Sequence, residues 1–243
     1  DGLCKIDELI SRALELEYKA LALTDHGNLY GAIEFYKKAK KAGLKPIIGV
    51  EAYLAPRSRF DKTAKIDSRS YHLTLLAENE KGYRNLLQLI TKAWLEGFYY
   101  KPRIDKEILK EHSQGLIALS GCPQGEIPKI LLAGNFDLAK KKAFEYLEIF
   151  GQDNFYLEVN YHPNLEDTKK LRQALTRLSE ETKIPLVATY DVHYLKSEDN
   201  EVHDIFLAIQ TGKDIDGEER LTMKNDDFSL ADKVRMNELY KDL

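Results

Sequence analysis

Short apolar runs typical of buried strands alternate with segments of helical periodicity along nearly the whole chain. The six strand-like runs cover residues 20–24, 46–53, 72–77, 116–120, 155–159 and 185–190. The helical patterns cover residues 29–42, 81–97, 105–111, 124–133, 136–150, 166–181 and 198–209, with a weaker one at the C-terminal end. This alternation predicts an α/β fold in which adjacent, mostly parallel strands are covered by helices.

The start of the chain departs from this alternation. A helical pattern that includes Ile6 and Leu9 begins almost at the first residue, although a barrel normally offers a strand before its first helix. A strand upstream of Asp1 would raise the number of strands from six to seven. The polar segment 55–70 is predicted to be a loop. Because no repeat, low-complexity tract or Pro/Gly-rich linker interrupts the chain, residues 1–243 are interpreted as one domain.

The charge balance limits the kinds of partner. The 243 residues include 36 Lys and Arg against 40 Asp and Glu, a formal net charge of −4. This balance excludes a domain that grips duplex DNA through phosphate neutralisation alone, so any contact with nucleic acid should be local, metal-assisted or supplied by other parts of a larger protein. Cys4 and Cys122 give no disulfide framework, so a reducing cytoplasm is expected. No apolar run approaches the length of a membrane span.

Side chains of the metal-binding types stand at or near the ends of the apolar runs. They are His26, Glu51, His72, Cys122, Glu158, Asp191 and His193. Barrel folds gather their sites from strand ends, and these side chains bind Zn²⁺, Mn²⁺ or iron ions. Asp191 and His193 are two residues apart, so an extended segment directs both to one face. All of them except Glu158 are predicted to converge in one cleft, where metal ions would serve phosphate-ester hydrolysis.

Other polar features are interpreted differently. His112, His162 and His203 sit in polar or helical surroundings, receive no functional role and are expected outside the cleft. The lysine clusters within residues 37–41 and 140–142 are interpreted as solvated helix faces. Residues 98–103 combine aromatic and basic side chains, as single-strand nucleic-acid binding does. A structural turn over the barrel mouth is the alternative for that segment.

Six segments, in this order, resemble the PHP (polymerase and histidinol phosphatase) domain family. They are Asp1-Gly2-Leu3, Leu23-Thr24-Asp25-His26-Gly27, Gly49-Val50-Glu51-Ala52-Tyr53, His72-Leu73-Thr74-Leu75-Leu76-Ala77, Leu119-Ser120-Gly121-Cys122 and Ala188-Thr189-Tyr190-Asp191-Val192-His193. The chain is most similar to the version at the N-terminus of bacterial replicative DNA polymerase III alpha subunits. The segment typical of that version is Gly97-Phe98-Tyr99-Tyr100-Lys101-Pro102-Arg103-Ile104-Asp105.

The resemblance implies a distorted seven-stranded (β/α) barrel of PHP type, whose first strand, with a His-x-His motif, is missing from this chain. It also implies up to three divalent metal ions, with zinc expected and manganese or iron as alternatives. The implied metal ligands are Asp1, His26, Glu51, His72, Cys122, Asp191 and His193. Asp25, His26 and Asp191 would be catalytic, with Asp25 orienting His26 rather than binding metal. Apart from the resemblance, the aromatic and basic pattern of residues 98–103 predicts Tyr100, Lys101 and Arg103 as the substrate contacts.

For function, the resemblance implies the PHP domain of a DNA-directed DNA polymerase alpha subunit, which takes part in DNA replication. The expected activity is metal-dependent 3′–5′ exonuclease proofreading on the primer 3′ end, with the remaining polymerase domains after residue 243. The chain alone is expected to be a poor nuclease, because two ligands and a strand are missing. One alternative is a non-catalytic platform that stabilises the polymerase and docks a separate proofreading exonuclease subunit. The other is a free-standing small-molecule phosphatase such as histidinol phosphatase, which residues 100–103 disfavour.

Overall fold

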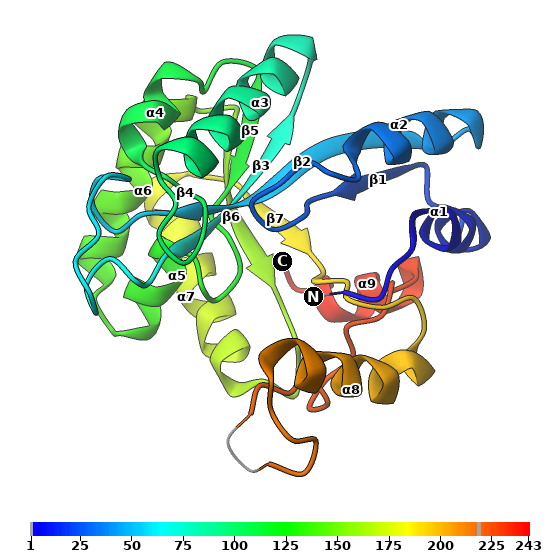
Figure 1. Ribbon diagram of the computed structural model, residues 1–243. Coiled ribbons are helices and arrows are strands. Elements are labelled where there is room, and N and C mark those ends of the chain that lie inside the picture. Colours follow the sequence, from blue (N-terminus) through cyan, green and yellow to red (C-terminus); the bar gives the residue numbers. More distant parts are fainter. Residues whose placement is uncertain (1, 218–219) are drawn as a thin grey trace.

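A curled sheet of seven strands forms the centre of the protein in a computed structural model that describes residues 2–217 and 220–243 (Figure 1). The strands are β1 (Ala20–Leu23), β2 (Lys45–Leu54), β3 (Tyr71–Ala77), β4 (Arg103–Ile104), β5 (Leu116–Leu119), β6 (Phe155–Asn160) and β7 (Leu186–Thr189). The helices are α1 (Ile6–Glu15), α2 (Ala32–Lys41), α3 (Glu80–Leu95), α4 (Lys106–Glu111), α5 (Glu126–Leu132), α6 (Phe136–Phe150), α7 (Glu166–Thr182), the 3-10 turn η1 (Ser197–Asp199), α8 (Asn200–Thr211) and α9 (Lys233–Tyr240). In the parts of the chain that are described, no helix is long and apolar enough to cross a membrane.

The predicted elements are present with small shifts. Each of the six predicted strands agrees with an observed strand to within one residue at either end. The strand β4 was not predicted, because two residues that begin with a charged Arg103 give no apolar run. It pairs in parallel with β2, with Tyr53 opposite Arg103. The segment 55–70 contains no helix or strand, as predicted.

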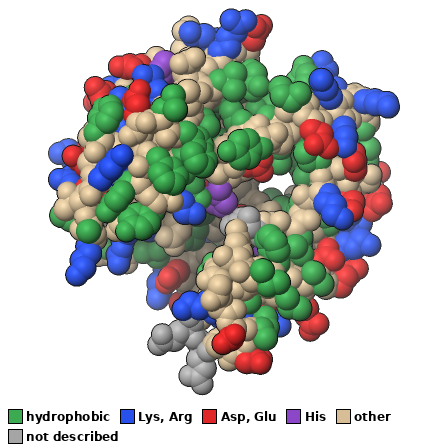
Figure 2. Space-filling model, viewed as in Figure 1, with side chains coloured by type: hydrophobic (Ala, Val, Ile, Leu, Met, Phe, Trp, Pro, Cys, Tyr) green, Lys and Arg blue, Asp and Glu red, His purple; other side chains and the backbone are tan. Residues whose placement is uncertain are grey.

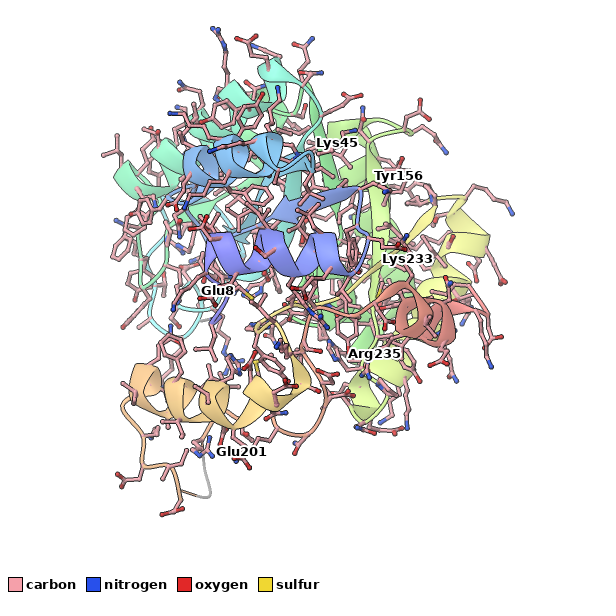
Figure 3. The ribbon with its side chains drawn as sticks, turned by 90° about the vertical axis from the view of Figure 1, so that its right-hand side faces the viewer. Glu8, Lys45, Tyr156, Glu201, Lys233 and Arg235 are labelled. Atoms are coloured by element: carbon pink, nitrogen blue, oxygen red, sulfur yellow. The ribbon has the colours of Figure 1, made fainter. Side chains whose placement is uncertain are left out.

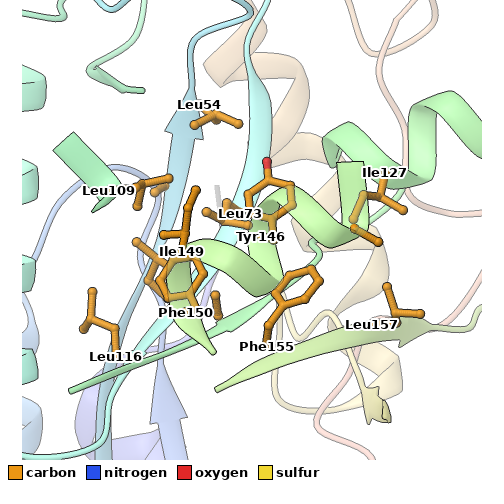
Figure 4. Packing of buried hydrophobic residues seen from close by; sticks show 14 of the residues in the cluster. Leu54, Leu73, Leu109, Leu116, Ile127, Tyr146, Ile149, Phe150, Phe155 and Leu157 are labelled. Atoms are coloured by element: carbon orange, nitrogen blue, oxygen red, sulfur yellow. The ribbon is translucent and has the colours of Figure 1, made fainter. Parts of the chain in front are cut away.

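The larger hydrophobic core lies between the sheet and the helices α3 to α7. Figure 4 shows Leu54 and Leu73 from two neighbouring strands facing Tyr146 and Phe150 of α6. The buried hydroxyl of Tyr146 donates a hydrogen bond of 2.8 Å to Glu126, so its polar group is satisfied within the core. A smaller core between α1, α2 and the sheet is separate from it. Together they hold the strands whose ends carry the candidate site.

The direction of β3 corrects the prediction of mostly parallel strands. The pairs β1–β2, β5–β6 and β6–β7 are parallel, but β3 runs antiparallel to both β2 and β5. A parallel neighbour requires a crossover connection, usually a helix, and the chain between β2 and β3 has none. As a result, the first residues of β3 lie beside the last residues of β2, at the same end of the strands.

The curled sheet leaves a gap between its two edge strands. The strand order is β1-β2-β3-β5-β6-β7, and within residues 2–217 and 220–243 no pairing joins β1 to β7. A cavity of about 1310 Å³ is lined by apolar residues of both edges, among them Leu21, Leu23, Val187 and Ala188. Tyr156, labelled in Figure 3, lines the same cavity. The fold is therefore a curled half-barrel that is open between β1 and β7.

We expect the free energy of unfolding to fall between about pH 6.5 and pH 4 because of one buried histidine. His162 is 2% exposed and stacks on Phe228 with ring centroids 4.1 Å apart. Burial lowers the pKa of His162 to about 4. Since an unfolded histidine titrates near 6.5, only the unfolded state gains this proton within that window, which destabilises the fold by up to about 1.4 kcal/mol per pH unit.

Urea denaturation of the native chain and of His162→Phe between pH 4.5 and pH 7 measures this effect. Phenylalanine keeps the ring against Phe228 but cannot titrate, so the stability of the variant should depend less on pH. Burial also lowers the pKa of His203 to about 4, but His203 is present in both proteins and cancels in the comparison. Equal pH slopes for the two proteins would contradict the prediction.

Candidate metal centre

Three neighbouring strands place a histidine, a glutamate and a second histidine on one face of the sheet. His26 follows β1 and forms a parallel bridge with Glu51, which lies in β2. In the antiparallel pair β2–β3, Tyr53 is opposite His72 and Glu51 is opposite Thr74. Residues two apart in a strand point to the same face, so Glu51 and His72 project to the same side. Because β3 runs antiparallel to β2, His72 at the start of β3 lies near Glu51, which is close to the end of β2.

The donor atoms of these three side chains lie close enough to share one ion. A carboxylate oxygen of Glu51 lies 2.5 Å from Nδ1 of His72, and its other oxygen lies 3.6 Å from Nδ1 of His26. One donor atom from each of the three lies within 4.8 Å of the others. The ring of Tyr53 stacks on His26 at 5.7 Å and meets the edge of His72 at 5.4 Å, which fixes the orientation of both imidazoles.

A tight loop after β5 brings Cys122 into the same cluster. Its sulfur lies 3.4 Å from Nδ1 of His72 and 3.6 Å from Glu51. The loop passes so close to β3 that a Cβ on Gly121, which has φ +88°, would lie 2.5 Å from the backbone oxygen of His72. Glycine is therefore required at this position if Cys122 is to reach the cluster.

Asp191 and His193 approach the cavity from the end of β7. Both line it together with His26, Glu51 and Cys122. Nδ1 of His193 lies 3.4 Å from a carboxylate oxygen of Asp191, and the backbone N–H of His193 donates to the carbonyl of Phe228 at 2.9 Å. The predicted ligand Asp1 lies outside the described residues.

Glu158 is an additional acidic group of the cavity. It lies in β6, is 6% exposed, and accepts hydrogen bonds from Thr74 at 3.1 Å, from Thr189 at 2.7 Å and from the backbone of Gly121 at 3.1 Å. Burial raises its pKa to about 7. Its position after the apolar run 155–157 gave the same signal as the other candidates, but no role was assigned to it from the sequence.

The electrostatics of the cluster favour a cation. Burial and the charges of Glu51 and Asp191 raise the pKa of Cys122 well above its ordinary value, and burial together with Glu51 raises the pKa of Asp191. Burial would also raise the pKa of Glu51, but the hydrogen bond from His72 and the nearby His26 outweigh it and hold the pKa low. A divalent cation would relieve this repulsion and stabilise the thiolate. Two imidazoles, carboxylates and a thiol are a donor set that suits zinc.

The predicted catalytic residue Asp25 also lines the cavity. Its carboxylate accepts a hydrogen bond from the backbone of Gly31, and burial raises its pKa. Of the predicted substrate contacts, Tyr100 and Lys101 line the cavity. The ammonium of Lys101 lies 5.3 Å from the centroid of the Tyr53 ring.

The prediction that Arg103 contacts substrate is wrong. Its side chain is 1% exposed and does not line the cavity. Its guanidinium donates hydrogen bonds of 2.9–3.0 Å to the backbone carbonyls of Gly97, Asp67, Arg59 and Asp61. All of these partners are backbone oxygens, so Arg103 fixes the backbone at these four residues instead of binding a ligand.

None of the three histidines that were assigned no role lines the cavity. His203 nevertheless lies closer to the site than expected, because its ring meets that of His193 edge-on at 5.4 Å. α8 carries His203, and packing of this helix beside the end of β7 could not be read from the local sequence. Figure 2 shows the entrance to the site as a hollow with histidine at its base and hydrophobic side chains on its rim.

The chain is similar in sequence to one protein family and to one kind of bacterial protein. The family profile described as "PHP domain" matches residues 1–162. The chain is 47% identical over 244 residues to the DNA polymerase III subunit alpha of Borreliella burgdorferi, covering 100% of this chain and 21% of that protein. It is 50% identical over 232 residues to the subunit of the same name from Thermus aquaticus, covering 94% of this chain and 19% of that one. The chain thus spans about a fifth of the length of these relatives. Among solved structures, an amidohydrolase from Chromobacterium violaceum matches with a TM-score of 0.49 and 14% identity over 79% of this chain and 84% of that one.

Proposed function

Because this chain belongs to the PHP domain family, we propose that its cavity is a metal-dependent phosphoesterase site that removes nucleotides from the 3′ end of DNA. The observation that carries the proposal is the donor cluster of His26, Glu51, His72 and Cys122 beside an open cavity. The chain would act as part of a bacterial replicative DNA polymerase alpha subunit, since its relatives of that name are about five times longer. Its partners would be the primer 3′ end and the other domains of that polypeptide, in the cytoplasm.

The residues have distinct parts in this proposal. Metal ions would be held by His26, Glu51, His72, Cys122, Asp191 and His193, with Asp1 as a further ligand. When bound, such ions supply Lewis acidity toward a phosphate oxygen and toward water. Thr74 and Thr189 fix the orientation of the Glu158 carboxylate inside the cavity. Lys101 at the mouth offers a positive charge to the phosphate backbone.

A strand upstream of Asp1 is part of the same proposal. Both edge strands of the sheet line the cavity with apolar side chains, including Leu21 of β1 and Val187 of β7. Unpaired apolar edges are a liability that proteins cover. A strand inserted between β1 and β7 would pair with both and close the barrel. A His-x-His motif on that strand would add two donors to the metal centre.

The proposed activity is tested with a chain that carries this upstream strand and with 5′-labelled single-stranded DNA. We expect stepwise shortening from the 3′ end in the presence of zinc or manganese, and no shortening after a chelator removes the metal. Metal-loaded protein without any hydrolysis would contradict the proposal and favour a non-catalytic platform for a separate exonuclease. Turnover of histidinol phosphate but not of DNA would contradict it in favour of a small-molecule phosphatase.

A further inference from the structure

The mouth of the cavity carries a group of large aromatic side chains that the metal centre does not use. Trp94 and Phe98 are 42% and 45% exposed, and Tyr100 is 69% exposed. All three line the same cavity as His26 and Glu51. Isolated exposed apolar side chains are common on protein surfaces, but a cluster beside a polar site marks a binding surface. We call Trp94, Phe98 and Tyr100 the aromatic rim.

The orientation of the aromatic rim is fixed relative to the metal centre. The rings of Trp94 and Phe98 stack with centroids 5.5 Å apart and an angle of 19° between their planes. The indole N–H of Trp94 donates a hydrogen bond of 2.9 Å to the carbonyl of Gly27, the residue after His26. Gly27 has φ +62°, and a Cβ there would lie 2.9 Å from Pro102 and 3.0 Å from Tyr53. This hydrogen bond and the close packing at Gly27 hold the indole beside the loop that carries His26.

Positive charge lies next to the aromatic rim. Lys101 follows Tyr100 directly and lines the cavity, with its ammonium 5.3 Å from the Tyr53 ring. Tyr100 itself is placed by a left-handed backbone, φ +60°, and by edge contact with Tyr99 at 4.7 Å. The whole chain has a net charge of −4, so attraction for phosphate at this site must come from local cations such as Lys101.

We propose that the aromatic rim stacks on the unpaired bases of the last nucleotides of a single-stranded nucleic acid and so selects this substrate for the metal centre. Aromatic side chains beside a cation, at the entrance to a phosphate-ester site, match a chain of alternating bases and phosphates. A small phosphate ester would occupy the metal centre without reaching the rim. In a duplex, the bases are paired and stacked on one another, so only the outer face of the last base pair is exposed and the bases behind it cannot reach the rim. The proposal rests on the proposed function, because it assigns the substrate of the same site.

Binding without catalysis gives the first test. The chain has a single tryptophan, Trp94, so its fluorescence reports directly on the rim. With metal removed by a chelator, a single-stranded oligodeoxynucleotide should quench this fluorescence. An oligonucleotide with abasic sites at its last nucleotides, or a blunt duplex of the same length, should quench it much less. Equal quenching by normal and abasic strands would overturn the proposal.

Two variants separate stacking from general hydrophobicity. Phe98→Leu keeps an apolar side chain but removes a ring, and it should weaken binding of the normal strand by roughly 5- to 150-fold, while binding of the abasic strand stays unchanged. Phe60→Leu is the matched control, because Phe60 is 56% exposed, lies under Arg59 and does not line the cavity. A loss in Phe60→Leu as large as that in Phe98→Leu would overturn the proposal.

The outcomes for the rim and for the proposed activity can be told apart. If the protein hydrolyses DNA with metal but Phe98→Leu does not change binding, the proposed role of the aromatic rim is overturned and the proposed function stays intact. Base-dependent quenching in a protein that binds zinc but hydrolyses no phosphodiester would support the rim as a single-strand binding surface and contradict the proposed function.

Discussion

Replacing Glu51 with glutamine is expected to weaken zinc binding by at least about 100-fold, because Glu51 lies at the centre of the donor cluster. Its carboxylate lies between His72, His26 and Cys122. Glutamine has nearly the same shape but carries no negative charge. By mass action, a 100-fold weaker site loses about 2.7 kcal/mol of the stabilisation that zinc gives at a fixed concentration. Zinc content by elemental analysis, affinity from competition with a chelator, and the zinc-induced rise in melting temperature measure this change.

The stability of the metal-free protein distinguishes a ligand from a structural glutamate. Glu51 raises the pKa values of Cys122 and Asp191, so removing its charge relieves repulsion. The substitution also loses the charge-assisted hydrogen bond with His72. Because these two effects oppose each other, the melting temperature of Glu51→Gln without zinc should differ from that of the native chain by much less than the zinc-induced rise. Glu34→Gln is the matched control, since Glu34 is exposed on α2 and pairs only with a surface lysine among the contacts described. Native zinc affinity in Glu51→Gln would contradict the proposed metal centre.

A chain extended at its N-terminus by a strand with a His-x-His motif is expected to melt roughly 5–10 °C higher than the chain without it. Filling the gap would pair the free edges of β1 and β7 and bury apolar side chains that now line the cavity. A net gain of about 2–3 kcal/mol corresponds to this shift for a domain of this size. Metal content and hydrolysis of DNA should rise together with stability. Thermal melting, elemental analysis and the 3′-end assay measure the three quantities.

Two control extensions separate the strand from its histidines. An extension of equal length made of glycine and serine should leave the melting temperature unchanged. An extension with Gln-x-Gln in place of His-x-His should raise the metal-free melting temperature equally but should not raise metal content. If backbone amides of β1 and β7 exchange with solvent as fast in the His-x-His protein as in the shorter chain, the strand does not occupy the gap.

The positions of the strands could be predicted from the sequence, but the direction of one of them could not. Short apolar runs define where a strand lies regardless of its neighbours, so β5 and β6 were located to within a residue. Direction depends on the path of the connection. Nothing in the polar composition of residues 55–70 states that this loop returns the chain antiparallel to β2. For the same reason, β4 is defined by its pairing with β2 and not by its own sequence.

At the site, motifs predicted which side chains gather but not what surrounds them. His26, Glu51, His72 and Cys122 stand at strand ends, and strand ends meet in a curled sheet. Arg103 was misjudged because a charged side chain is exposed by default, and only the folded structure shows the carbonyls that surround its guanidinium. Trp94 was not predicted because its part depends on contact with Gly27, which is distant in sequence.

The contacts of Arg103 with backbone carbonyls have a consequence for where a peptide can be inserted into this protein. The length of segment 55–70 alone suggests a tolerant site, but these contacts indicate the opposite. A long surface segment without helix or strand usually tolerates a tag, a cut or a new chain terminus. Here one guanidinium holds the backbone at Arg59, Asp61 and Asp67, so the segment behaves as part of the rigid shell. An inserted peptide belongs instead in the exposed turn at residues 151–153, where a Cβ on Gly151 would meet nothing within 4 Å.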